Sequence, residues 1–183
     1  PTAPAPREPG MLIQEGLTKE AKAKIKRSGR MLQYHARERL NTKWLSFITL
    51  TYGKDWPDDP TAKNHLNRFL NKVRRRYGKI KYVWVVERQK RGAIHYHILT
   101  DQYIPKDTLN PMWDKIVAKW QAYEGHQRQT VRPNVIGIDT NKPGQAEHYL
   151  MKYMTKKDEH LQGNLYNISQ PLRELMKPTA AYE

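Results

Sequence analysis

Three side chains in the middle of the chain have the types and spacing of a metal site. The segment GAIHYHILT, residues 92–100, has the apolar alternation of a β-strand, yet it contains His95 and His97. Side chains at positions i and i+2 of a strand point to the same face, so the two imidazoles lie side by side. Glu87 precedes His95 by eight residues, and the turn-like residues 89–92 between them predict a β-hairpin that returns the carboxylate to the histidines.

Two neutral imidazoles and one carboxylate suit a divalent cation, with positions left open for a substrate. A His-x-His pair also occurs by chance, and a lone histidine in a strand is usually structural. A polar pair on a buried face is costly without partners, however, and Glu87 sits at matching depth on the neighbouring strand. The sequence therefore predicts a metal site formed by Glu87, His95 and His97.

A second reactive group lies towards the C-terminus. Tyr149 and Tyr153 are four residues apart, and so are Lys152 and Lys156. At about 100° per residue, the four side chains fall within an arc of roughly 100° on a helix. An ordinary amphipathic helix gives the same spacing. Beside a metal site, the group suits phosphoryl transfer: a phenol with a pKa near 10 is a poor nucleophile, but it can attack a phosphodiester that a metal polarises and lysines steady.

The overall charge restricts the partners. The 183 residues include 33 Lys and Arg against 18 Asp and Glu, a formal net charge of +15, and the sequence pI is near 9.9. This balance favours nucleic acid or an anionic membrane surface. No run approaches the roughly 20 apolar residues of a membrane span, and no secretory signal is visible, so we expect a cytoplasmic protein without a membrane partner. The chain has no cysteine, which excludes disulfides and thiolate metal sites.

The most basic segment, residues 72–81, carries six cationic side chains. It is predicted to follow a phosphate backbone while neighbouring aromatic rings stack on unpaired bases. A solvated helix end with cations near its C-terminus is the alternative. The candidate DNA contacts are Arg74, Arg75, Arg76, Lys79 and Lys81.

The elements that must position these groups can be read from periodicity. We expect strands over 44–52, 80–88, 93–100, 134–139 and 164–169, and helices over 61–78, 106–123 and 143–158, the last with Pro143 at its start. This order, with a hairpin in its centre, predicts an α+β fold with a central, mostly antiparallel five-stranded sheet flanked by helices.

Three segments follow from the same reading. Residues 1–41 form a basic N-terminal arm, residues 42–170 the catalytic domain, and residues 171–183 a C-terminal tail. Within the arm, residues 1–10 are Pro-rich and expected to be extended or disordered. Residues 17–40 predict a basic helix, interrupted at Ser28 and Gly29, that is either a flexible arm or a DNA contact.

Four motifs stand in an order that resembles a known group of enzymes. They are FITLTY (47–52), GAIHYHIL (92–99), YLMKYMTKK (149–157) and GNLYNIS (163–169). Across roughly residues 42–170 the chain resembles the HUH endonucleases, specifically the rolling-circle replication initiators of single-stranded DNA phages and plasmids. The histidine and tyrosine motifs carry most of this resemblance. In the related conjugative relaxases the tyrosine precedes the histidines, and single-strand transposases usually have one tyrosine.

The resemblance implies a nuclease that nicks a single-stranded origin, with or without a hairpin, through a 5′-phosphotyrosine. Glu87, His95 and His97 would hold Mg²⁺ or Mn²⁺, with Mn²⁺ bound more tightly because imidazole is not the ligand that Mg²⁺ prefers. Two tyrosines would alternate, so that a second cleavage releases a closed circle. The sequence does not rank Tyr149 against Tyr153. No G-x-x-x-x-G-K-[ST] motif is present, so the expected partners include a separate helicase and host replication proteins.

Three alternatives remain open at this point. A single-strand transposase or relaxase-like nuclease would use the same metal chemistry. A non-catalytic RRM-like domain would need exposed aromatic residues on its central strands and shows no RNP motif. A phosphodiesterase that uses water would explain the metal ligands but leave the tyrosines and lysines without a role.

Overall fold

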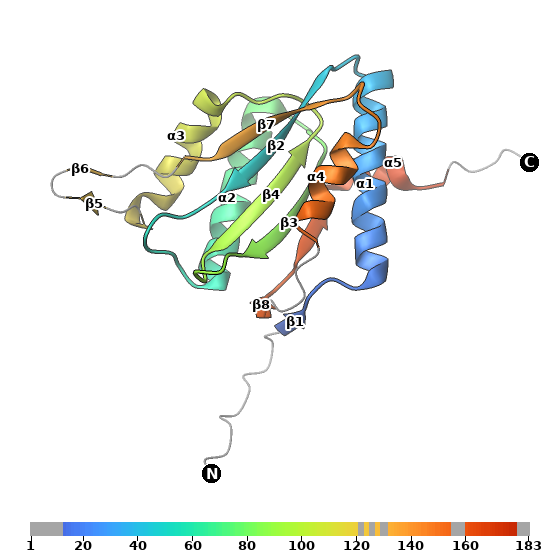
Figure 1. Cartoon of the computed structure of the whole chain (residues 1–183). Helices are drawn as coiled ribbons and strands as arrows, with labels where there is room; N and C mark the ends of the chain where they lie inside the picture. Colours follow the sequence, from blue (N-terminus) through green and yellow to red (C-terminus); the bar gives the residue numbers. More distant parts are fainter. Residues whose placement is uncertain (1–12, 121–122, 125–126, 129–131, 155–159, 179–183) are drawn as a thin grey trace, which may run out of the picture.

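A five-stranded antiparallel sheet forms the centre of the fold (Figure 1). The computed structural model describes residues 13–120, 123–124, 127–128, 132–154 and 160–178. The strands lie side by side in the order β7 (Asn134–Asp139), β2 (Trp44–Leu50), β4 (Ile94–Thr100), β3 (Tyr82–Arg88) and β9 (Tyr166–Ile168). All neighbouring pairs are antiparallel. The predicted α+β class and the five predicted strands are confirmed.

Helices cover both faces of this sheet (Figure 1). One face carries α1 (Lys19–Glu38), α4 (Gln145–Lys152) and α5 (Gln170–Met176). The opposite face carries α2 (Asp59–Tyr77) and α3 (Lys106–Val117), which continues into the 3₁₀ turn Ala118–Trp120.

The alternation of strand side chains divides the interior into two cores. On β2, Ile48 and Leu50 point towards α2 and α3, whereas Leu45 and Phe47 point towards α1, α4 and α5. Both faces of the central strands are therefore buried, which explains why they read as nearly continuous apolar runs. Any polar side chain that points from these strands into a core needs a partner.

Two small two-stranded pairs lie outside the central sheet. β1 (Ile13–Glu15) pairs with β8 (His160–Gln162), and β5 (Tyr123–Glu124) pairs with β6 (Gln127–Arg128). None of the helices in the described part of the chain is both long and apolar enough to cross a membrane.

Helix α1 is continuous, and the interruption predicted at Ser28 and Gly29 is wrong. The Ser28 hydroxyl donates to the carbonyl of Ile25, and Gly29 lies where α1 meets α4. A Cβ atom at Gly29 would be 2.8 Å from Cδ1 of Leu150, so glycine permits the close approach of the two helices. The residues that resembled a break thus form a helix contact. The Pro-rich residues 1–10 lie outside the described residues.

The buried face of α1 places it within the second core. Ile25, Leu32 and Ala36 are fully buried there, in contact with the core formed by α4, α5 and the sheet. The helical part of residues 17–40 is therefore packed, not a flexible arm. DNA contact by its outer face stays a prediction.

Several element boundaries differ from the predicted ones. Helix α2 begins at Asp59, capped by the side chain of Asp58, and ends at Gly78 as predicted, with φ at 78°. Helix α3 ends at Val117 and not near residue 123. The segment predicted as a tail from residue 171 includes most of α5, which buries Leu172 and Met176 against the second core.

Candidate metal centre and active site

The β3–β4 hairpin brings the predicted metal ligands together. In the register of these two strands Glu87 lies opposite His95, and His97 follows two residues later on the same face. The turn closes with a hydrogen bond from the Gln89 amide to the carbonyl of Ala93, 2.8 Å long. The convergence that the spacing predicted is confirmed.

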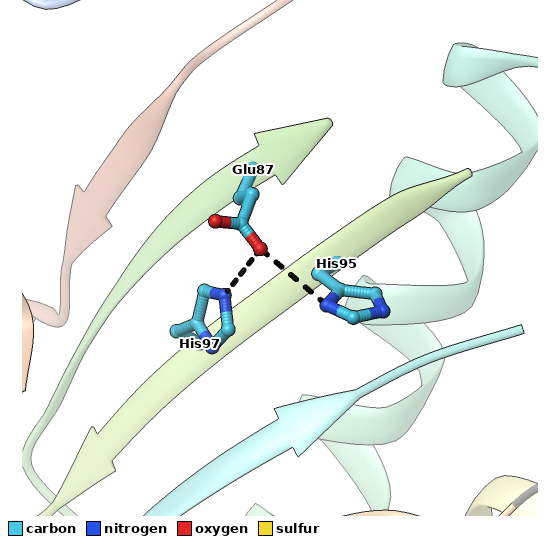
Figure 2. A group of neighbouring side chains, drawn as sticks. All are labelled: Glu87, His95 and His97. Atoms are coloured by element: carbon cyan, nitrogen blue, oxygen red, sulfur yellow. Dashed lines mark hydrogen bonds and ion pairs between the residues drawn. The ribbon is translucent and has the colours of Figure 1, made fainter. Parts of the chain in front are cut away.

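One carboxylate oxygen lies between the two imidazoles (Figure 2). Glu87 Oε1 is 3.5 Å from His95 Nδ1 and 3.4 Å from His97 Nε2. One ligand atom from each of the three residues lies within 4.8 Å of the others. Glu87 is 8% exposed and His97 1%, so two of the three polar side chains are nearly removed from water.

These three donors fit a divalent cation. A buried carboxylate between two neutral imidazoles gives a mixed oxygen and nitrogen set with room for further ligands, and both borderline metals and Mn²⁺ accept such a set. The site can therefore bind a metal, although the donor types do not select between Mg²⁺ and Mn²⁺.

Two threonines that sequence reasoning did not single out lie behind the histidines. Thr49 Oγ1 is 3.0 Å from His97 Nδ1, and Thr51 Oγ1 is 2.7 Å from His95 Nε2. Thr49 is the register partner of His97 in the β2–β4 pair. The signal in the sequence was the Thr-x-Thr spacing of the first strand motif, which matches the His-x-His spacing of the strand that pairs with it.

Tyr153 lies directly against one of the metal ligands. Its ring is stacked on the imidazole of His97, with 3.5 Å between the ring centroids and 18° between the planes. Phe47 flanks both rings, 5.9 Å from His97 and 5.7 Å from Tyr153. Burial raises the pKa of the Tyr153 phenol, and the charges of Glu87 and Tyr149 raise it further.

Helix α4 is shorter than predicted, and this changes the relation between the two tyrosines. It begins at Gln145, after Pro143, and ends at Lys152. Tyr153 is the C-cap residue, with φ −103° and ψ 4°, and its amide reaches the carbonyls of Leu150 and Met151. The helix ends here because its last turn tightens while Tyr153 stacks on His97. The prediction that both tyrosines share one helical face is therefore wrong.

The two tyrosines are nevertheless close to each other. Tyr149 lies on α4 with its ring 5.5 Å from that of Phe47, the residue that also flanks Tyr153. Lys152 places its ammonium group 4.5 Å above the ring of Tyr149, in a cation–π contact. Lys156, the second predicted lysine, lies outside the described residues.

A comparison with protein families agrees with this geometry. The family model that matches residues 45–158 is described as a replication-associated protein of the ORF2 type. The chain belongs to this family. The matched range contains the three converging ligands and both tyrosines, and the resemblance to replication initiators is confirmed at the level of the family. No curated protein sequence matches the chain.

The predicted DNA-contacting residues of this replication-associated protein lie away from the metal centre. Arg74, Arg75 and Arg76 are exposed at the C-terminal end of α2, which covers the sheet face opposite to the metal ligands. Lys79 is exposed beside them, and Lys81 lies 3.9 Å from the carboxylate of Asp101. They precede the start of β3, five residues or roughly 17 Å before Glu87.

Proposed function

We propose that the protein is a metal-dependent endonuclease and strand transferase that acts on single-stranded DNA. It nicks a replication origin through a 5′-phosphotyrosine and thereby initiates and terminates rolling-circle replication. The observation that carries this proposal is the stacking of Tyr153 on His97, because it places a nucleophile beside a side chain that can hold a metal. Membership of a replication-associated family supports the choice of DNA as substrate.

The residues divide the chemistry among them. Glu87, His95 and His97 form the binding site, and a divalent cation there would polarise the scissile phosphodiester. The Tyr153 oxygen forms a bond to phosphorus, the bond from phosphorus to the 3′ oxygen breaks, and that oxygen takes a proton. Burial and Glu87 hold Tyr153 in its neutral form, so the phenol keeps its proton until substrate enters.

Tyr149 is the candidate for the second nucleophile. Tyr153 contacts a ligand side chain directly, whereas Tyr149 lies one ring further away, across Phe47. We therefore assign the first cleavage to Tyr153 and the second to Tyr149, with Lys152 steadying negative charge near Tyr149. Lys156 stays a candidate for the same role.

The outer face of α1 is a better candidate for the DNA path than the end of α2, because α1 and the metal ligands share a sheet face. An exposed stripe runs along this helix with one side chain in every turn. Tyr34, at its centre, is 53% exposed and can stack on a base. The stripe consists of Lys24, Arg27, Arg30, Tyr34 and Arg37. A separate helicase and host replication proteins would supply strand separation and copying.

Cleavage of a random-sequence single-stranded DNA library tests this function without knowledge of the origin. Mn²⁺ should give fragments with a free 3′ hydroxyl and with protein on the 5′ end, and EDTA should give none. A phosphodiesterase that uses water would leave a free 5′ or 3′ phosphate and no bound protein. A non-catalytic nucleic-acid binder would retain the library uncut in both conditions.

A further inference from the structure

We propose that Thr49 and Thr51 are positioning residues that let His97 and His95 exchange their ring tautomers when a cation binds. Each hydroxyl holds the ring nitrogen that faces away from Glu87, both before and after the exchange. This inference rests on the proposed metal site and adds a role for the first strand motif, which the mechanism above does not use.

The two histidines present different nitrogens to the centre. His97 directs Nε2 towards Glu87 and Nδ1 towards Thr49, whereas His95 directs Nδ1 towards Glu87 and Nε2 towards Thr51. All four nitrogens therefore have an oxygen partner, at 2.7 and 3.0 Å on the threonine side and 3.4 and 3.5 Å on the carboxylate side. The indole of Trp113 fixes the backbone at Thr51 by donating to its carbonyl, 2.9 Å away.

The nature of these partners decides what each ring can do. An ionised carboxylate only accepts hydrogen bonds, so the inner nitrogen of each neutral ring carries the proton and donates to Glu87 while no cation is bound. The outer nitrogen then accepts a hydrogen bond from the threonine hydroxyl. A ligand nitrogen must offer a lone pair to a cation, so in the loaded site the proton belongs on the outer nitrogen.

A hydroxyl serves both states because it can donate or accept after a rotation. The ring loses one proton from its inner nitrogen to solvent and takes one on its outer nitrogen, so it stays neutral. A backbone carbonyl or a carboxylate at the outer position could accept in the loaded state but could not donate in the free state. His97 is almost fully buried, and an unpaired ring nitrogen there would be costly in either state.

Metal affinity provides the first test. Thr49→Val and Thr51→Val keep the shape of the side chain and remove the hydroxyl, so each should weaken Mn²⁺ binding by about 10- to 100-fold in a direct titration. Thr49→Ser should restore most of the affinity. Thr100→Val is the matched control: the Thr100 hydroxyl donates to the carbonyl of Gln102, 2.7 Å away, so its loss should leave Mn²⁺ affinity unchanged.

Nitrogen NMR of the imidazoles provides the second test, with a readout that a merely structural role would not move. At about pH 8.5 the neutral rings show which nitrogen carries the proton. His97 should change from the Nε2–H to the Nδ1–H form when the protein is saturated with Mg²⁺, and His95 should change in the opposite sense. In the valine variants the metal-free spectrum should also change, because the outer nitrogen loses its donor.

The outcomes separate this inference from the proposed function. Wild-type protein that binds neither Mn²⁺ nor Mg²⁺ would overturn the metal site itself. Wild-type binding together with unchanged affinity in both valine variants would overturn only the role of the threonines. An equal loss in Thr49→Ser and Thr49→Val, or identical tautomers with and without Mg²⁺, would also overturn it.

Discussion

The rings of His97 and Tyr153 are stacked, with their centroids 3.5 Å apart. This contact joins a metal ligand on β4 to a candidate nucleophile at the end of α4, two segments more than 50 residues apart in the chain. Anything that moves the end of α4 therefore moves the phenol relative to the metal centre. The predictions below test the two sides of this contact and the surfaces around it.

Removal of one ligand should abolish cleavage while the protein stays folded. His95→Ala is the best variant, because His95 is less buried than His97 and does not stack on Tyr153. We expect no detectable nicking of single-stranded DNA in Mn²⁺, wild-type affinity for DNA in EDTA, and a thermal midpoint close to that of the wild type. Cleavage by the wild type in excess EDTA would contradict a metal requirement.

The salt dependence of DNA binding should locate the path of the strand. Each phosphate contact to single-stranded DNA adds about 0.7 to the slope of log K against log salt concentration. The triple variant of Lys24, Arg30 and Arg37 to Gln should lower this slope by about 2. The matched triple variant of Arg74, Arg75 and Arg76 removes the same charge from α2 and should change the slope less. The reverse result would assign the DNA path to the end of α2.

The contact between α1 and α4 should be sensitive to any side chain at Gly29. Gly29→Val places atoms where Leu150 now lies, and we expect a loss of about 1–3 kcal/mol in the free energy of unfolding. The same substitution should cost less in a Leu150→Ala background, because the opposing side chain is shorter there. Equal costs in the two backgrounds, measured by denaturant unfolding, would show that the two residues do not interact.

Lys63 should make stability depend on pH in the alkaline range. Its ammonium group lies 4.1 Å above the ring of Trp84, without a hydrogen-bond partner among the described residues, and burial lowers its pKa from 10.5 to about 8. The unfolded chain therefore binds more protons between pH 8 and 10.5, so wild-type stability should rise across this window.

Lys63→Met removes this titration. After allowance for solvent screening, it should stabilise the protein by on the order of 1 kcal/mol at neutral pH, and the gain should shrink as the pH rises through the window. A difference between variant and wild type that is constant with pH would show that Lys63 is not perturbed by burial.

The sequence was most informative where chemistry and strand periodicity coincide. The alternation of His95 and His97, with Glu87 across a short turn, was enough to predict three converging ligands, because strand pairing fixes which side chains face each other. The five strands and the antiparallel sheet followed from the same period-two pattern.

Tertiary contacts decided the features that the sequence did not reveal. The apolar and basic periodicity of residues 143–158 indicates one long helix, but the stacking of Tyr153 on His97 ends α4 at Lys152. Gly29 resembles a helix break in isolation and is a helix contact in the fold. The roles of Thr49 and Thr51 depend on the register between β2 and β4, which no local pattern specifies.

Identification of the covalently modified residue tests the central claim most directly. Wild-type protein incubated with a random single-stranded DNA library and Mn²⁺ is denatured, digested and examined by mass spectrometry. We predict a nucleotide joined through its 5′ phosphate to Tyr153 in the first turnover, with Tyr149 modified in Tyr153→Phe and no adduct in the double Phe variant. Cleaved DNA without any adduct, or an adduct that persists in the double variant, would contradict a mechanism based on these two tyrosines.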